Sequence, residues 1–169
     1  IWNFWKRKSL YKETHHGRAK ATESFEQLMT QRIYYCRTWF RAKKKTTEVW
    51  LAKKAEAAHQ SKQPYTTLVG SVEAPYCFLD IADKVVGVGF LDDRLRESLT
   101  YAFKEVEAGK LFLTMAVHRE FEGETDKVAS AMTYIFDQGG TVRIRREFFN
   151  PHRLETATSS FDPAPNFAA

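Results

Sequence analysis

The apolar positions in the first third of the chain recur at the spacing of an α-helix. Five of them follow one another at intervals of four, four, three and four residues, namely Phe25, Met29, Ile33, Cys36 and Phe40. This spacing sets them along one side of a helix. Ser24 and Gln27 match a capping box, a pair that commonly begins a helix. The pattern therefore predicts a helix from about residue 24 onward.

The composition of the same segment extends this prediction. Residues 22–60 contain neither Gly nor Pro, and residues 48–59 are rich in Ala, Glu and Lys, which are good helix formers. Pro64 disfavours helical backbone at Gln63, the residue before it. We therefore predict one long helix, or two that are interrupted near residues 43–45, ending before Gln63.

Beyond Pro64 the pattern changes to short β-branched and aromatic runs between turn-forming residues, which is typical of strands. Strands are predicted at residues 65–72, 76–81, 85–91, 111–121, 132–136 and 141–148. The last two form a hairpin, because Gly139 and Gly140 supply the positive φ angles that tight turns require. Gly87 and Gly89 lie inside a predicted strand, which indicates a bulge, a bend or a close backbone approach.

Residues 92–109 fit two kinds of structure. Apolar residues at helical spacing, an Asp at position 92 or 93 as the N-cap and Gly109 after the last turn favour an amphipathic helix. The rival interpretation is a strand, because Tyr101 and Phe103 alternate with polar neighbours. We predict the helix and keep the strand as the alternative.

Alternation within two predicted strands assigns side chains to faces. In residues 111–121 one row is apolar and is predicted to face the core: Leu111, Leu113, Met115 and Val117. His118 and Glu120 lie on the other face. In residues 141–148, Arg143 and Arg145 point away from an apolar row made of Val142, Ile144 and Phe148. One face of the sheet is therefore expected to meet solvent.

These patterns predict an α+β fold, with an N-terminal helical segment packed on or extending from an antiparallel sheet that carries one further helix. We expect a basic helical segment over residues 1–63, a β-rich domain over residues 64–150 and an irregular tail over residues 151–169. No apolar run approaches the ~20 residues that cross a bilayer. Residues 1–8 lack the apolar core of a signal peptide, so we expect a soluble, cytoplasmic protein.

The net charge of +5 divides unevenly along the chain. Residues 1–64 hold 15 Lys and Arg against 5 Asp and Glu, which gives +10, whereas residues 65–169 hold 11 against 16, which gives −5. Such asymmetry bears on partners and not on fold. The basic part suits phosphate groups, the acidic part suits a basic protein, and the two parts also suit each other.

The opening residues mix aromatic rings with cations, and a second cationic run follows later. The residues concerned are Trp2, Trp5, Lys6, Arg7, Lys8, Lys43, Lys44 and Lys45. Rings that stack on bases beside cations that contact phosphate are typical of nucleic-acid binding. The same mixture suits a membrane surface, and an arm whose rings pack on the protein body or on a second subunit is the plainest interpretation. No zinc-finger, RNP or KH signature accompanies these residues.

Few residues suggest chemistry. His118 and Glu120 form a candidate acid–base or metal site, although solvated residues on a wet face explain them more simply. Arg143 and Arg145 form a candidate anion site or an ion-pair ladder with Glu147. The two cysteines, at positions 36 and 77, lack metal-binding spacing and are expected to be buried and apolar in character. We therefore predict no catalytic residue, no metal and no cofactor.

Residues 76–150 resemble small β-rich bacterial proteins of the immunity type, which neutralise a toxin made by the same cell. The resemblance rests on the strings Leu-Phe-Leu-Thr-Met-Ala at residues 111–116 and Thr-Tyr-Ile-Phe-Asp-Gln-Gly-Gly-Thr-Val at residues 133–142. It implies a non-catalytic protein with an acidic binding surface, which would suit a basic toxin by charge complementarity.

The sequence thus favours a binding protein that recognises a protein partner through an acidic face of its sheet, in the manner of an inhibitor or immunity protein. The alternative is a nucleic-acid-binding protein that uses the basic, aromatic N-terminal segment. A membrane surface fits less well, and assembly into a homo-oligomer stays open. An enzyme is the third interpretation, with His118 as its first candidate participant.

Overall fold

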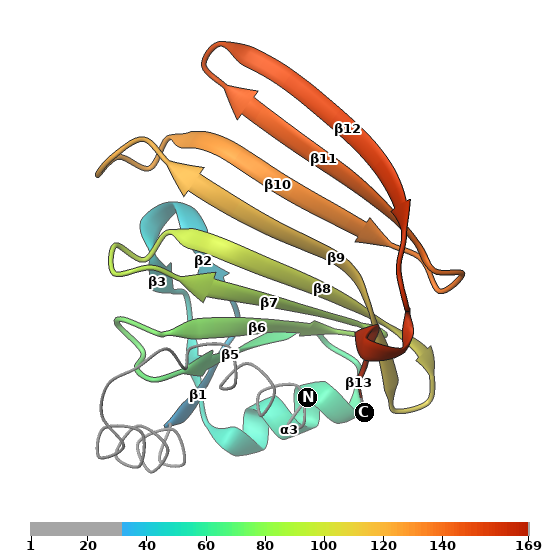
Figure 1. The fold of residues 1–169 in the computed structure, drawn as a ribbon. Helices are drawn as coiled ribbons and strands as arrows, with labels where there is room; N and C mark the ends of the chain where they lie inside the picture. The colour runs from blue at the N-terminus through green and yellow to red at the C-terminus, as the bar shows by residue number, and fades with distance from the viewer. Residues whose placement is uncertain (1–31, 169) are drawn as a thin grey trace, which may run out of the picture.

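The computed structural model describes residues 32–168, which form one long antiparallel sheet (Figure 1). Its eleven strands follow the order β12-β11-β10-β9-β8-β7-β6-β5-β1-β4, with β13 beside β9, and β2 and β3 pair separately. The elements are β1 (Ile33–Cys36), β2 (Trp39–Phe40), η2 (Arg41–Lys43), β3 (Lys45–Thr46), β4 (Val49–Trp50), α3 (Ala52–Gln60), β5 (Tyr65–Val69), β6 (Cys77–Ala82), β7 (Val85–Leu91), β8 (Glu97–Glu107), β9 (Lys110–Phe121), β10 (Val128–Phe136), β11 (Thr141–Phe149), β12 (His152–Ser160), η3 (Ala164–Asn166) and β13 (Phe167–Ala168).

The predicted α+β fold with an N-terminal helical segment is wrong. Strands make up 58% of the structure and helical turns 11%, and α3 is the one helix of at least seven residues within residues 32–168. From β5 to β12 each strand pairs with the next along the chain, so this part is a continuous meander of hairpins. No helix in the described range is long and apolar enough to span a membrane.

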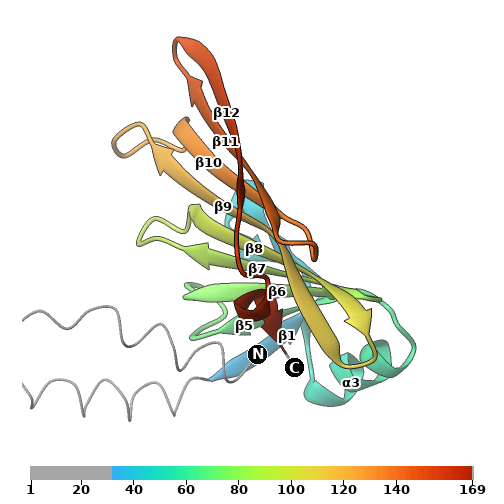
Figure 2. The same ribbon diagram turned by 45° about the vertical axis from the view of Figure 1, so that its right-hand side comes forward.

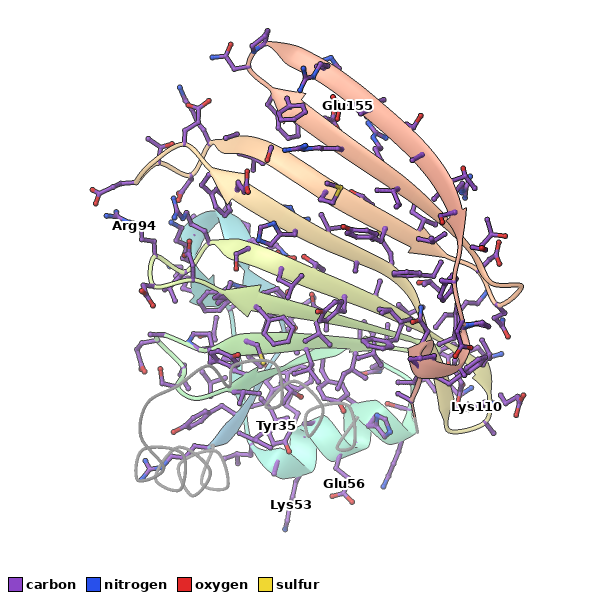
Figure 3. The ribbon with its side chains drawn as sticks, viewed as in Figure 1. Tyr35, Lys53, Glu56, Arg94, Lys110 and Glu155 are labelled. Carbon is purple, nitrogen blue, oxygen red and sulfur yellow. The ribbon has the colours of Figure 1, made fainter. Side chains whose placement is uncertain are left out.

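The sheet has two faces, which we name by what covers them. Residues that lie opposite each other on paired strands share a face, so the strand registers carry each assignment across the sheet. On the helix-side face, Ala55 and Ala58 of α3 pack with Tyr65 and its neighbours Tyr35 and Trp50. Figure 3 shows Lys53 and Glu56 of the same helix pointing away from the sheet. On the opposite face, which we call the hairpin-side face, Trp39 of the β2–β3 hairpin packs on Leu68 of β5 and Phe78 of β6.

A compact cluster of apolar side chains fills the hairpin-side face of β1, β5 and β6. Trp39 of β2 lies against Leu68 and Phe78, and all three side chains are at most 1% exposed. A β-carbon at Gly89 would lie 2.3 Å from the Phe78 ring, whereas one at Gly87 would meet nothing closer than 3.8 Å. Glycine at position 89 therefore allows the ring to lie directly on β7, so of the bulge, bend or close approach predicted for these glycines, position 89 shows the close approach.

Most of the predicted helix before Pro64 is also wrong where the structure describes it. Residues 33–50 form four short strands, and only α3 confirms the helical composition of residues 48–59. The cause is that β1 lies between β4 and β5 and carries apolar side chains on both faces, with Tyr35 packed toward the helix side and Cys36 toward the hairpin side. A short apolar run buried on both faces cannot be distinguished from a helix by its periodicity. The capping box at residues 24–27 lies outside the described residues.

Residues 97–107 form β8 and not a helix, so the rival strand interpretation of residues 92–109 is correct. Leu99, Tyr101 and Phe103 lie on the helix-side face, but the register with β9 shifts twice along this strand. Val106 is an extra residue at the second shift, and such bulges break the two-residue alternation that identifies a strand. Asp92 caps the turn before β8: its Oδ1 accepts hydrogen bonds from the backbone N–H groups of Arg94 and Arg96, both at 2.9 Å.

Two further predictions need correction. The apolar row of residues 111–117 does not share one face, because Thr114 is an extra residue where the β8–β9 register shifts. As a result Leu113 lies opposite Phe103 on the helix side, whereas Met115 lies opposite Ala102 on the hairpin side. The tail is not irregular, since residues 152–160 form β12. The predicted hairpin of residues 132–148 is confirmed as β10 and β11.

Candidate functional site

The strands farthest from α3 have no second layer over them within the described chain. Strands β10, β11 and β12, which we call the outer sheet, rise away from α3 and from the β2–β3 hairpin (Figures 1 and 2). All nine residues of β12 are exposed. A sheet normally buries at least one face against another layer, so this part of the molecule leaves unusual surface open.

The hairpin-side face of the outer sheet, which we call the outer face, combines apolar and cationic side chains. The register places these residues on it: Ala131, Thr133, Ile135, Arg143, Arg145, Glu147, Phe149, Leu154, Thr156 and Thr158. Three of its large apolar side chains are well exposed, namely Ile135 (36%), Phe149 (45%) and Leu154 (45%). Arg143 and Arg145 lie between them on β11, and both are exposed.

A short ion-pair chain runs across one end of the outer face. Arg145 Nη2 lies 3.0 Å from Glu147 Oε2, and His152 Nε2 lies 3.1 Å from Glu147 Oε1. The hydrogen bond from His152, together with the positive charge of Arg145, lowers the pKa of Glu147. Glu147 is therefore a firmly ionised acceptor that orients both neighbours. Arg143 has no such ion pair among the described salt bridges.

The helix-side face of the outer sheet is aromatic and better filled. The Tyr134 and Phe136 rings lie 6.3 Å apart, nearly parallel at 9°. The guanidinium groups of Arg146 and Arg153 lie 4.7 and 4.3 Å from the centre of the Phe148 ring. These contacts leave the aromatic rings half-buried, whereas the apolar side chains of the outer face meet solvent.

The structure separates the predicted site residues into groups that do not meet. His118 and Glu120 are exposed on the helix-side face of β9, and Ser130 Oγ donates to Glu120 Oε2 at 2.7 Å. Arg143 and Arg145 lie on the opposite face. The two candidate sites therefore lie on opposite faces of the sheet and share no surface.

The N-terminal candidates are only partly described. Trp2, Trp5, Lys6, Arg7 and Lys8 lie outside the described residues. In the second cationic run, Lys44 Nζ lies 2.6 Å from Asp126 Oδ1, and Lys43 Nζ lies 5.8 Å from the centre of the Phe40 ring. Lys45 is exposed on β3. The run is therefore partly engaged within the protein itself.

The acidic residues of the second part of the chain do not gather on the outer face. Of the 16 Asp and Glu in residues 65–169, nine lie outside the strands in turns and loops: Glu73, Asp83, Asp92, Asp93, Glu122, Glu124, Asp126, Asp137 and Asp162. Within the outer sheet, Glu147 and Glu155 stand against four arginines, at positions 143, 145, 146 and 153. The acidic surface that the charge count suggests is thus located at the strand ends.

Two features bear on catalysis. Within residues 32–168 no three His, Cys, Asp or Glu side chains are grouped so as to hold a metal ion. Cys36 and Cys77 are fully buried, as expected. Burial, with a smaller effect of the Asp80 charge, raises the pKa of Cys36 to about 11, and burial raises that of Cys77 to about 12. Both thiols therefore stay protonated and unreactive at neutral pH.

A cavity of about 440 Å³ opens on the hairpin-side face of the inner strands, next to Thr66 and Asp80. Both carboxylate oxygens of Asp80 already accept hydrogen bonds, from the Thr66 hydroxyl at 2.6 Å and from Arg41 Nη2 at 2.8 Å. Arg41 Nε also donates to Glu97 Oε2 at 2.7 Å. These bonds fasten η2 to the sheet, and they leave Asp80 as a structural acceptor and not a general base.

Comparison with protein-family models, with curated proteins and with solved structures found no match to this chain. Sequence reasoning found Arg143 and Arg145 but missed the exposed apolar residues beside them. The available signal for Leu154 was the run of β-favouring Thr residues at positions 156 and 158, which indicates a strand in the tail.

Proposed function

We propose that this chain is a non-catalytic binding protein that recognises a protein partner through the outer face. The observation that supports this most is the set of three exposed apolar side chains, Ile135, Phe149 and Leu154, on one open face of the sheet. Leu154 and Phe149 lie toward one end of this face and Ile135 toward the other, with the two arginines between them. Exposed apolar surface that is bordered by polar residues marks interaction sites. Burying it against a second protein would supply the layer that this part of the sheet lacks.

The chemistry of the outer face fits a protein better than a small ligand. Arginine and aromatic residues are enriched in the centres of protein interfaces, and the face combines Phe149 with Arg143 and Arg145. It is an open strand surface, whereas sites for small molecules are concave. The threonines at positions 133, 156 and 158 add hydroxyl groups that donate and accept hydrogen bonds.

The resemblance to immunity-type proteins stays a prediction, and it would make the partner a toxin. The charge distribution changes how such a partner would bind. A basic toxin would find acidic residues at the turns, in particular at Glu122, Glu124 and Asp126, and would find arginines on the outer face itself. We therefore expect apolar contacts and arginine–carboxylate pairs to dominate on the outer face.

The test is affinity purification from cells that make the protein, carried out with three forms of the chain. The wild type should recover one protein in stoichiometric amount. Arg145→Ala, on the outer face, should weaken recovery at least about tenfold, which is a typical effect of a central interface arginine. Arg146→Ala is the matched control, because this neighbouring arginine lies on the helix-side face of the same strand.

Two results would contradict the proposal. One is the absence of any stoichiometric protein across growth conditions. The other is a partner that Arg145→Ala and Arg146→Ala affect equally, because the outer face would then have no part in its recognition.

Nucleic-acid binding through the N-terminal segment is the second candidate, and the charge of +10 in residues 1–64 favours it. Binding driven by phosphate contacts weakens steeply with salt, with a slope set by the number of phosphates neutralised. The full chain should then bind single-stranded DNA or RNA at low salt and release it at high salt. If it binds neither at low salt, this candidate is excluded.

A further inference from the structure

The last strand of the sheet has an open edge. Strand β12 pairs with β11 over nine consecutive residue pairs, from Thr141 opposite Ser160 to Phe149 opposite His152, without a register shift. No described strand pairs with its other side, because β12 ends the strand order. Alternate N–H and C=O groups along that edge therefore point away from the sheet, which is a template for a further strand.

This edge lacks most of the features that usually prevent strand addition, and its two charged residues, Arg153 and Glu155, are of opposite sign. Edge strands are commonly short, bulged, or interrupted by Lys or Pro. The opposite edge of the sheet follows that rule, since β4 has only two residues. By contrast β12 has nine residues and contains neither Lys nor Pro. The chain after β12 returns to β9 as β13, away from the edge (Figure 1).

The sequence of β12 is suited to pairing with itself. When two copies of β12 pair antiparallel over all nine residues, the two-fold axis passes beside the middle residue, Thr156. The numbers of any two opposed residues then add to 312. Arg153 then faces Ser159 and Glu155 faces Ala157, so no like charges meet. Moving the axis to Arg153 or to Glu155 would set like charges opposite each other and shorten the overlap.

The charge of the edge also favours a second copy over a charged partner strand. Arg153 and Glu155 cancel, and they already form an ion pair at 3.3 Å within one chain. Two such edges approach each other without net repulsion. Each copy also brings an outer sheet of the same twist, so the two sheets can join as one, and closed two-fold dimers are the commonest symmetric assembly.

We propose that two copies of this chain associate edge to edge through β12, antiparallel, with Thr156 beside the two-fold axis. The pairing joins the two eleven-stranded sheets into one continuous sheet. It uses the backbone edge and leaves the outer face of each copy accessible, so it does not depend on the protein partner proposed above. The purified chain alone is enough to test it.

Cysteine cross-linking reads the register directly. Opposed residues of antiparallel strands have Cα atoms about 4.5–5.5 Å apart, within the range of about 4.4–6.8 Å that a disulfide spans. Under mild oxidation Thr156→Cys should give a covalent dimer. Leu154→Cys and Thr158→Cys should each stay monomeric in denaturing gels but should cross-link when mixed. The native Cys36 and Cys77 are fully buried and do not compete.

A second measurement detects the non-covalent dimer. Sedimentation of the wild type should show a concentration-dependent dimer. Thr156→Lys places two ammonium groups opposite each other at the axis and should raise the dissociation constant by up to about fivefold. Thr141→Lys, which adds the same charge at an exposed position on β11, is the control and should leave the dimer intact.

Three outcomes would overturn the proposal. The first is a wild type that stays monomeric at all concentrations. The second is a Leu154→Cys variant that forms a covalent dimer without Thr158→Cys present. The third is a dimer whose dissociation constant Thr156→Lys does not raise. None of these outcomes bears on the partner that the outer face is proposed to bind, because that binding is measured by Arg145→Ala.

Discussion

The inner strands β5–β8 and the outer strands β10–β12 belong to one sheet but differ in how far their side chains are buried. Strands β5 and β6 lie between α3 on one face and the β2–β3 hairpin on the other, and Leu68 of β5 and Phe78 of β6 are at most 1% exposed. In the outer sheet Val142 and Ser130 are the only buried residues of the 27 in its three strands. Both regions are paired as strands, so the covering layers, and not strand pairing, decide where side chains are buried.

This contrast indicates that the inner strands contribute mainly to stability, whereas the outer strands offer surface for binding. Removal of apolar surface from water contributes most of the stability of a domain, so the inner strands carry the stability of the fold. The outer strands are held by backbone pairing with their neighbours and expose large apolar side chains on the outer face. Surface of this kind is retained at a cost to stability, which is consistent with a role in binding.

The largest expected difference concerns two phenylalanines. Phe78→Ala should lower the free energy of unfolding by about 3–5 kcal/mol, because it empties a filled core site and removes the ring under Arg41. Phe148→Ala, on the half-buried helix-side face of β11, should cost about 1 kcal/mol. Urea unfolding followed by circular dichroism measures both. Equal losses would contradict the contrast between the regions.

A smaller effect is expected where the inner strands approach each other most closely. Gly89→Ala drives a β-carbon into the Phe78 ring and should cost about 1–3 kcal/mol, as overpacking does. Gly87→Ala, two residues along the same strand, meets only ordinary contacts and should be neutral or slightly stabilising. Thermal unfolding of the two variants compares them. A neutral Gly89→Ala would show that the ring can move aside.

The turn before β8 gives a pH-dependent test. Partial burial acts to raise the pKa of Asp92, but backbone and side-chain hydrogen bonds from Arg96 and a backbone hydrogen bond from Arg94 outweigh it, so the pKa lies below its usual value. Arg96 also donates to the carbonyl oxygens of Gly123 and Thr125, at 2.9 and 2.7 Å, and so joins two turns. An ionised Asp92 therefore stabilises the fold above its unfolded pKa of about 4.

Asp92→Asn should thus lower stability by about 1 kcal/mol near neutral pH. The difference from wild type should persist down to about pH 4 and disappear as the pH falls through the lowered pKa of the folded protein. Urea unfolding at several pH values measures this. Asp93→Asn, at the exposed neighbouring position, is the control. A difference that does not vary with pH would contradict the role assigned to the charge.

The smallest effect is expected on the outer face itself. Arg145→Ala should change the free energy of unfolding by no more than about 0.5 kcal/mol, as is usual for exposed substitutions. Thermal unfolding measures it. A large loss would mean that Arg145 supports the fold, and reduced partner recovery with this variant would then no longer report on the outer face.

The sequence predicted a strand correctly where its pairing is regular and one of its faces is polar. Strands that pair in regular register, such as the β10–β11 hairpin, were predicted correctly. Strand β8 was assigned to a helix because bulges at Thr114 and Val106 break its alternation and that of its partner. Strand β1 was missed because apolar groups on both its faces erase the alternation. The register of distant strands depends on the whole sheet, and local patterns do not encode it.

The candidate site was predictable in part for the same reason. Arg143 and Arg145 could be found because they alternate with apolar residues on β11. Leu154 could not, because three prolines in the tail suggested irregular structure, although all three lie outside β12. That His118 and Glu120 lie on the face opposite the two arginines follows only from the strand registers.

Hydrogen–deuterium exchange of the wild-type chain at low concentration tests the contrast between the two regions most directly. The backbone amides of β6 and β7 should exchange only through global unfolding, whereas those of β12 should exchange at least about tenfold faster through local opening. Equal protection of β12 and β6 in the dilute chain would contradict an outer sheet that has no second layer over its outer face within the described residues.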